Sequence, residues 1–179
     1  MPVLRGKRVT LRPIEREDVP ALTALMNDLE TVHRLSDQPP LPRSVEERWS
    51  DFDADVEDRP GDSVWFVVAV GDEVIGTCGF SRLDHYHGRA ELGIWLGRSW
   101  WGQGLGQDAM RTLLTFAFRN LNLHSVWLSA LADDARALGA YRKVGFKDAG
   151  RLREHSWFDG AFHDDVLMEI LRDDTESSP

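Results

Sequence analysis

The sequence predicts an α+β layered fold, in which helices cover both faces of a mixed central sheet. Strand-like and helix-like segments follow one another in the order β, α, α, β, β, β, α, β, α, β, β, which gives about seven strands. The chain has 179 residues and shows no internal repeat and no linker between two units. We therefore expect one domain over residues 1–171, followed by a polar and disordered tail over 172–179.

The segments before residue 60 are predicted to form one strand and two helices. Apolar residues alternate with polar ones over 7–13, which is typical of a strand. Apolar residues recur at helical spacing over 15–29. Ser44 and Glu47 have the spacing of a capping box, in which each side chain accepts the other's backbone N–H. They predict a second, acid-rich helix that begins there and ends near residue 58.

The segments after residue 60 alternate between strands and helices. Nearly every residue of 64–70 is apolar, as expected of a strand covered on both faces. Gly145 follows one predicted helix, which is the usual place for a glycine past a helix end. The predicted strands are 64–70, 73–83, 90–96, 124–130, 147–157 and 162–171, and the predicted helices are 105–121 and 134–144.

Charge and composition limit the classes of partner. The formal net charge of −9 argues against nucleic acid, because phosphate binding needs clustered Lys and Arg. It weakly favours a cationic or neutral substrate. The start of the chain lacks the apolar core of a signal peptide, and no run reaches the ~18 apolar residues of a membrane span. We therefore expect a cytoplasmic location and no membrane partner, and the single cysteine, Cys78, excludes an internal disulfide.

A glycine-rich turn lies between the strand that ends at Leu96 and the following helix. Its glycines, Gly102, Gly104 and Gly106, allow positive φ and the close approach of a ligand. Free N–H groups at a helix start form an anion-binding site, which suits a pyrophosphate group. The turn lacks the Gly-Lys-Ser/Thr end of a P-loop, and its G-x-G-x-G spacing differs from the dinucleotide fingerprint G-x-G-x-x-G. A purely structural turn is the alternative.

Two motifs together resemble the GNAT acetyltransferase superfamily. The first is similar to its acetyl-CoA loop, Q/R-x-x-G-x-G/A, with Trp101 in place of the usual Gln or Arg. The second is similar to N-x-x-S/A-x-x-x-Y-x-K-x-G-F, with Asp134 where Asn is usual. The residues that match the second motif are Ala137, Tyr141, Lys143, Gly145 and Phe146. The resemblance covers nearly the whole chain, and both ends look like the branch of ribosomal-protein N-terminal (RimJ/RimL-like) and spermidine acetyltransferases.

The resemblance implies a GNAT fold and acetyl-CoA as co-substrate. The sheet would splay between the strands at 90–96 and 124–130, and the pantetheine arm would lie in the gap beside the backbone of Leu96. The loop Gly102–Gln107 would hold the pyrophosphate. No metal is expected, since the histidines lack a third ligand at metal-site spacing. The expected cofactor-binding residues are Leu96, Trp101, Gly102, Gln103, Gly104, Leu105, Gly106, Gln107, Asp134, Ala137, Tyr141 and Lys143.

The resemblance also implies direct attack of an amine on the thioester in a ternary complex. Tyr141 would be the general acid, because relatives place this phenol near the CoA sulfur; it could instead only orient the cofactor. Glu91 is the candidate base, acting directly or through water. Alternation puts Glu91 and Trp95 on one face, and a carboxylate on a central strand usually lines a cleft. A structural carboxylate paired with Arg89 or Arg12 is the alternative.

The identity of the amine acceptor stays open in the sequence. A protein N-terminus, a polyamine, and an amino sugar or antibiotic amine all suit the resemblance, since fold does not choose among them. Trp49, Trp65, Trp95 and Trp157 could line an aromatic pocket for a flat or cationic group, or pack in the core. A non-catalytic acyl-CoA sensor is the alternative function. A homodimer could form through exposed aromatics such as Trp157 or Phe158.

Overall fold

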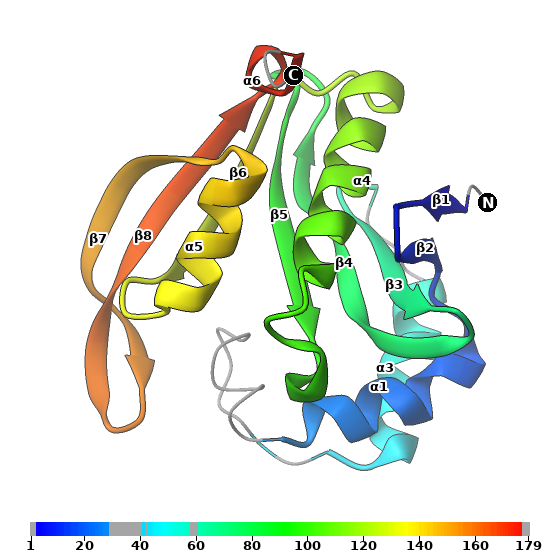
Figure 1. Cartoon of the computed structure of the whole chain (residues 1–179). Coiled ribbons are helices and arrows are strands. Elements are labelled where there is room, and N and C mark those ends of the chain that lie inside the picture. Colours follow the sequence, from blue (N-terminus) through cyan, green and yellow to red (C-terminus); the bar gives the residue numbers. More distant parts are fainter. Residues whose placement is uncertain (1–2, 29–40, 42, 58–60, 177–179) are drawn as a thin grey trace.

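The computed structural model describes residues 3–28, 41, 43–57 and 61–176. In this part of the chain, one mixed sheet contains eight strands: β1 (Leu4–Arg5), β2 (Thr10–Pro13), β3 (Val64–Val70), β4 (Glu73–Asp84), β5 (Arg89–Leu96), β6 (Ser125–Leu131), β7 (Lys147–Phe158) and β8 (Ala161–Leu171). Their spatial order is β1-β2-β3-β4-β5-β6-β8-β7 (Figure 1). Neighbours pair antiparallel except β5 and β6, which run parallel.

Helices connect the strands and cover the sheet. The described helices are η1 (Arg16–Asp18), α1 (Val19–Met26), α3 (Val45–Glu57), η2 (Arg98–Trp100), α4 (Leu105–Asn120), α5 (Ala135–Val144) and α6 (Arg172–Glu176). Helix α1 packs against α3 and β4, and α4 packs against α5 and several strands (Figure 1). Among these described helices, none is long and apolar enough to cross a membrane.

The core lies between α4 and one face of the sheet. Helix α4 buries a stripe at helical spacing that includes Leu113 and Ala117, and this stripe shares one cluster with Phe80 and Leu92 of the sheet. Val67 is also buried but lies outside this cluster. Its side chain points to the opposite face, where α1 packs against β4. The sheet thus separates two layers of helices, which confirms the predicted α+β layered fold.

Most predicted elements agree with the structure, with differences at their ends. The capping box is confirmed, since Ser44 N donates to Glu47 Oε2 at 2.7 Å and Glu47 N donates to Ser44 Oγ at 3.2 Å. The predicted strand 7–13 begins only at Thr10, because Gly6 N donates to Val9 O and closes a turn. The two-residue strand β1 was not predicted and accounts for the eighth strand. The helix predicted over 15–29 is shorter in the structure, where a 3-10 turn over Arg16–Asp18 precedes α1 and α1 ends at Met26 with Asn27 as its C-cap. The predicted helix end near 58 lies outside the described residues.

The prediction of a disordered tail is wrong over residues 172–176, which form α6. Arg172 Nε donates to Leu123 O at 3.0 Å, and Lys147 Nζ donates to Asp174 Oδ1 at 2.5 Å. The polar side chains that suggested disorder therefore attach this segment to the sheet and to the loop before β6. The last three residues of the predicted tail lie outside the described part of the chain.

Candidate active site

The site begins where β5 and β6 separate. The two strands pair from Arg89↔Ser125 to Glu91↔Trp127, and among the described residues no ladder joins them beyond that point. A cavity of about 400 Å³ opens in the gap and is lined by residues of both strands and of the helices that follow them. The predicted splay between these strands is therefore confirmed.

The cavity passes through the sheet. Ile94 and Leu96 belong to the side packed by α4, so Trp95 between them faces the opposite side. Leu128 is in the α4 core, so Ser129 and Leu131 share the side of Trp95. Apart from Leu128, all of these residues line the cavity. One ligand can thus enter from the α4 side while another approaches from the opposite face.

The glycine turn forms one wall of the cavity. Gly102 and Gly104 have φ of 73° and 78°, which favours glycine, and α4 begins directly after Gly104. The first turn of α4 therefore presents its N–H groups and positive dipole end to the cavity. Of the predicted turn residues, Gln103 alone does not line the cavity. Its carbonyl instead accepts a hydrogen bond from Arg8 Nη1 at 2.6 Å.

Asp108 ties this turn to the N-terminal strands. Its carboxylate accepts the backbone N–H groups of Lys7, Arg8 and Val9 at 3.0, 2.7 and 3.1 Å. Burial acts to raise the pKa of Asp108, but the three hydrogen bonds outweigh it, so the pKa lies below its ordinary value. Sequence reasoning missed both Asp108 and Arg8, because their partners lie about a hundred positions away and share no pattern with them.

The opposite wall is the start of α5. Asp134 is buried and caps this helix, since its Oδ1 accepts the N–H of Ala137 at 2.9 Å. Its Oδ2 lies 3.3 Å from Arg136 Nη2. The predicted residues Asp134, Ala137, Tyr141 and Lys143 all line the cavity. The acidic residue at the usual Asn position therefore serves the helix itself, in addition to facing the cavity.

A contact between Trp101 and Arg136 bridges the two walls. The guanidinium carbon of Arg136 lies 3.9 Å from the centre of the Trp101 ring, in cation–π geometry. Trp101 Nε1 donates to Leu96 O at 2.7 Å. The departure from the usual Gln or Arg at position 101 thus replaces a flexible polar side chain with a fixed indole. Arg136 occupies an unspecified position of the second motif, so no sequence pattern indicated it.

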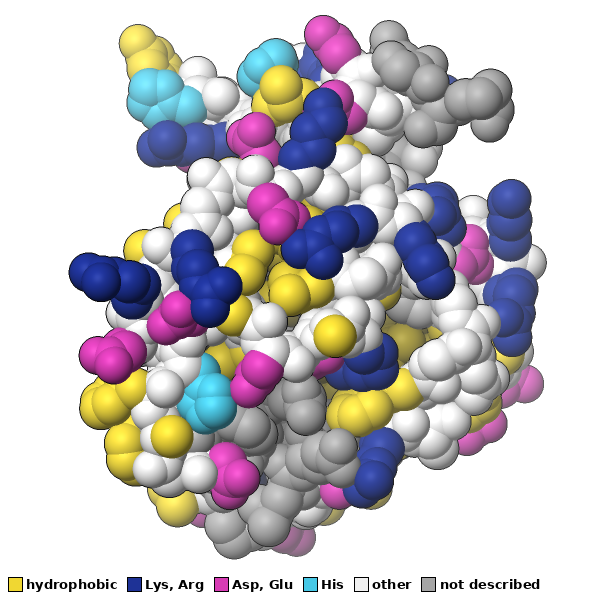
Figure 2. All heavy atoms as spheres, turned by 60° about the vertical axis from the view of Figure 1, so that its left-hand side comes forward, with side chains coloured by type: hydrophobic (Ala, Val, Ile, Leu, Met, Phe, Trp, Pro, Cys, Tyr) yellow, Lys and Arg dark blue, Asp and Glu magenta, His cyan; other side chains and the backbone are white. Residues whose placement is uncertain are grey.

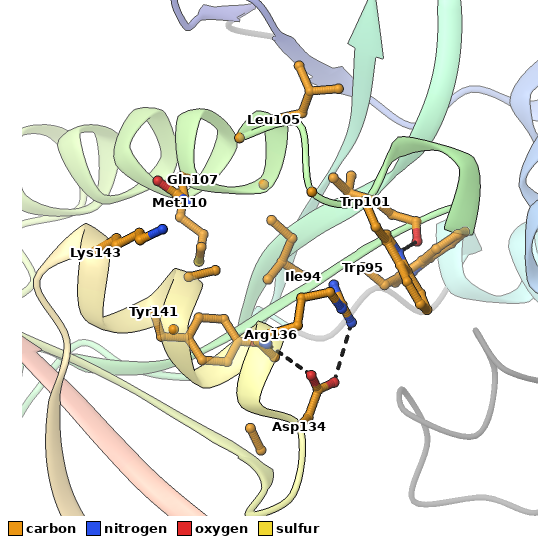
Figure 3. A pocket seen from close by; sticks show the side chains of 18 of the residues that line it. Ile94, Trp95, Trp101, Leu105, Gln107, Met110, Asp134, Arg136, Tyr141 and Lys143 are labelled. Atoms are coloured by element: carbon orange, nitrogen blue, oxygen red, sulfur yellow. Dashed lines mark hydrogen bonds and ion pairs between the residues drawn. The ribbon is translucent and has the colours of Figure 1, made fainter.

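Tyr141 projects from α5 into the cavity, on the same side as Asp134 and Arg136 (Figure 3). Its ring packs edge-on against Phe146, with 6.1 Å between ring centres. Burial, and then the negative charge of Asp134, raise the pKa of Tyr141 to about 12. The phenol therefore keeps its proton at neutral pH. Trp101, Trp95 and Ile94 lie across the cavity from it (Figure 3).

Glu91 lies at the point where the strands part, and it is not among the cavity-lining residues. Its carboxylate is ion-paired with Arg82, at 2.8 Å between Nη1 and Oε2. The guanidinium of Arg82 also lies 5.7 Å from the centre of the Trp127 ring. The expected alternative partners are engaged elsewhere, Arg89 with Asp84 and Arg12 with Asp18.

The four candidate tryptophans do not form one aromatic pocket. Trp95 lines the cavity. Trp49 lies in a separate hollow between η1 and α3, where the guanidinium carbon of Arg16 lies 4.8 Å from the centre of its ring. Trp157 packs edge-on against Phe162 near the tip of the β7–β8 hairpin, and both are exposed. Trp65 lies across the sheet, because a Cβ built on Gly93 would meet its ring at 2.5 Å. The side chain of Phe158 lies outside the described part of the structure.

The charge of the cavity differs from that of the whole chain. Arg136 and Lys143 line it, while the acid that lines it, Asp134, is engaged as a helix cap. Figure 2 shows many Lys and Arg side chains on the side of the molecule that carries α5 and the β7–β8 hairpin, despite the net charge of −9. The cavity therefore combines a helix start, cations and apolar walls, as a ligand with phosphates on a long flexible arm requires.

Two other chemistries receive no support from the described residues. No group of three or more His, Cys, Asp and Glu side chains among them is placed to hold a metal ion. Cys78 is buried in the core away from the cavity, and burial raises the pKa of its thiol. The thiol is thus held in the form that is a poor nucleophile.

Comparison with known proteins identifies the family. A model described as an acetyltransferase (GNAT) domain matches residues 8–147. The spermidine N(1)-acetyltransferase of Escherichia coli strain K12 is 30% identical over 92% of this chain and 86% of that protein. The structures of Vibrio cholerae spermidine N-acetyltransferase with CoA and spermine, and of the ribosomal L7/L12 acetyltransferase RimL with CoA, share the fold. Their TM-scores are 0.86 and 0.87 at 24% and 20% identity, over 96% and 97% of this chain and 100% and 99% of theirs. The chain therefore belongs to the GNAT acetyltransferase family and is an acetyl-CoA-dependent N-acetyltransferase.

Proposed function

We propose that the acetyl group passes directly to a primary amine, with Tyr141 as general acid and Glu91 as general base. The observation that carries this proposal is the position of the Tyr141 phenol, which is half-buried, lines the cavity beside the gap in the sheet and has a pKa raised to about 12. Acetyl-CoA, when bound, supplies a thioester whose sulfur leaves as a thiol. A phenol that keeps its proton at neutral pH is suited to protonate such a leaving group.

The residues that would hold acetyl-CoA are those of the two cavity walls. The backbone N–H groups of Gly102 and of Gly104–Gln107, at the start of α4, suit the pyrophosphate, whereas Gln103 does not line the cavity. Lys143 and Arg136 add positive charge for the phosphates. The apolar part of the cavity suits the pantetheine arm, with the backbone of Leu96 and the residues Asp134 and Ala137 beside it. Trp101 orders the position of Leu96 through its hydrogen bond.

We propose that Glu91 serves the acceptor rather than the cofactor. It lies on the sheet face shared with Trp95, opposite the α4 side, at the closed end of the gap. An acceptor ammonium that arrives on this face would lose a proton to the carboxylate, directly or through a water molecule, before it attacks. Arg82 balances the charge of this carboxylate in the structure.

The test is thiol release from acetyl-CoA over a panel of amines. Spermidine is the first acceptor to try, because the Escherichia coli relative is named for it; an N-terminal peptide of a ribosomal protein and an amino sugar follow. Tyr141→Phe should lower kcat by about 100-fold or more while the KM for acetyl-CoA stays within about threefold. Tyr86→Phe, at an exposed tyrosine, is the matched control.

The panel also tests the alternative function. Acetyl-CoA binding without thiol release for any amine would favour a non-catalytic acyl-CoA sensor. Unchanged turnover in Tyr141→Phe would remove this residue from the mechanism and leave it a cofactor-orienting role.

A further inference from the structure

Asp165 on β8 is a buried carboxylate that is only half satisfied. The residue is 7% exposed. Its Oδ2 accepts hydrogen bonds from Ser156 Oγ at 2.8 Å and from Ser129 Oγ at 3.5 Å. Its Oδ1 is buried and has no hydrogen-bond partner among the described residues. An ionised carboxylate presents about four lone-pair sites, so one entire oxygen here is left without a donor.

The fold does not require a charge at this position. The preceding residue, Asp164, accepts from Arg151 Nε at 2.6 Å and from the N–H of Glu154 at 2.8 Å, and thereby fixes the irregular part of β7. Asp165 makes no such structural contact with a cation among the described residues. Buried polar groups are normally paired, and an orphaned carboxylate oxygen costs stability. Such a group in a native structure calls for an explanation, and a role at a functional site is one.

Asp165 lies on the acceptor face, next to the cavity. It is paired in register with Leu131 of β6, and Leu131 and Ser129 both line the cavity. Because Val166 belongs to the core on the α4 side, Asp165 points to the opposite face, which is also the face of Glu91. Ser129 is exposed, so a ligand in the cavity can reach the hydroxyl that contacts Asp165.

The distance between the two carboxylates favours an extended ligand. Glu91 is level with Trp127, and Asp165 is level with Leu131, four residues further along β6. At about 3.3 Å per residue this is about 13 Å along the strand. The side chains between these levels on the same face are Ser129 and the cross-strand neighbour Leu167, which suit a methylene chain.

We infer that Asp165 binds a second cationic group of the acceptor, so that the preferred substrates are diamines or polyamines. This inference rests on the proposed function, since it assumes that the reacting amine lies near Glu91. An ammonium offers three donors and would supply the partner that Oδ1 lacks. Rotation of the carboxylate about its last torsion exchanges the two oxygens, so the free one can turn toward a ligand that passes Ser129.

The experiment compares diamines with monoamines of the same length. Diaminopropane, putrescine, cadaverine, diaminohexane and diaminooctane are tested beside propylamine, butylamine, pentylamine, hexylamine and octylamine, with thiol release as the rate assay. The wild-type enzyme should prefer one diamine length over the matched monoamine by on the order of tenfold or more in kcat/KM. Asp165→Asn should abolish this preference and leave the monoamine rate and the KM for acetyl-CoA unchanged.

A control variant and a second measurement distinguish a ligand-binding role of Asp165 from a structural one. Asp159→Asn removes a charge from the same hairpin at an exposed turn position with φ of 46°, which Asn adopts readily, and it should keep the diamine preference. Asp165→Asn should unfold at the same temperature as the wild type or a few degrees higher, since an uncompensated buried charge is removed. A merely structural carboxylate would instead lower the unfolding temperature and leave the preference intact.

Two outcomes would overturn the inference: a wild type without preference for diamines, or an Asp165→Asn variant that retains the preference. Calorimetric titration of the same diamines into the CoA-bound protein keeps the site testable without turnover. If no amine releases thiol, the proposed function fails, and diamine binding that depends on Asp165 still decides whether the carboxylate recognises a cation.

Discussion

Single residues at this site owe their properties to partners that lie far away in the sequence. Alternation along β5 predicted the face on which Glu91 lies, yet its partner Arg82 follows from a break in the β4–β5 register between Ser81 and Asp84. Arg82 has φ of 50° at this break, and that backbone turn brings the guanidinium over Trp127. Irregular strand geometry has no period, so the pairing could not be predicted.

The variant Glu91→Gln tests whether the carboxylate of this single residue acts as the general base. The variant keeps the shape of the side chain but cannot accept a proton, so we expect kcat/KM to fall by about 100-fold and the acidic limb of the pH–rate profile to disappear. The KM for acetyl-CoA should not change. Glu73→Gln, at an exposed acid of β4, is the control. A pH–rate profile identical to that of the wild type would assign Glu91 a purely structural role with Arg82.

At the scale of elements, local signals in the sequence were the most informative. The capping box fixed the start of α3, and glycines marked the start of α4 and the end of α5, because each depends on residues a few positions apart. The two-residue β1 has too few residues for a pattern. The helix α6 depends on contacts with Leu123 and Lys147, which no local pattern records. The motifs therefore predicted the cavity walls, but not Arg136 or Asp165.

Trp65, Gly79 and Gly93 lie side by side on β3, β4 and β5, and the indole of Trp65 packs over the two glycines. This contact can be tested by substitution. A Cβ on Gly93 would lie 2.5 Å from the Trp65 ring, and an indole has no flexible end that could yield. We expect Gly93→Ala to lower the free energy of unfolding by about 1–3 kcal/mol. Gly150→Ala, where the added Cβ would meet Leu167 at an ordinary 3.9 Å, is the matched control. Urea denaturation measures the free energy of unfolding of both variants. If Gly93→Ala were as stable as Gly150→Ala, the close contact with the Trp65 ring would be contradicted.

At the scale of the whole molecule, the buried Asp18 and the half-buried Asp108 join the N-terminal segment to the rest of the fold. Asp108 holds the turn before β2, and Asp18 is paired with Arg12 at 2.7 Å. Burial acts to raise the pKa of Asp18, but hydrogen bonds from the Arg12 guanidinium and the N–H of Glu15 lower it more, so the net shift is downward. Element order and composition predicted the layered fold, whereas these links required the three-dimensional structure.

These lowered pKa values predict acid sensitivity. A carboxyl whose pKa is lower in the folded state stabilises the fold fully above its unfolded value, here 3.8, and the stabilisation is lost as the pH falls toward the folded pKa. Asp18→Asn should lower the free energy of unfolding by about 1–3 kcal/mol at pH 7 and flatten its decline below about pH 4. Asp72→Asn, in an exposed turn, is the control. Urea titrations at a series of pH values measure how the free energy of unfolding depends on pH in the wild type and in each variant. If Asp18→Asn lost stability below about pH 4 as steeply as the wild type, the assignment would be contradicted.

The separation of β5 from β6 leaves two strand edges inside the molecule rather than on its rim. Open strand edges are templates for unwanted pairing with other chains, and proteins usually blunt them with charge, bulges or covering segments. Here α4 and α5 flank the opening, so another protein's strand has little access, while a narrow flexible ligand fits. A ligand that binds only the folded form adds stability in proportion to the logarithm of its concentration, about 2.7 kcal/mol at a hundredfold excess over Kd. Acetyl-CoA bound in this opening would therefore raise the free energy of unfolding of the protein as its concentration rises.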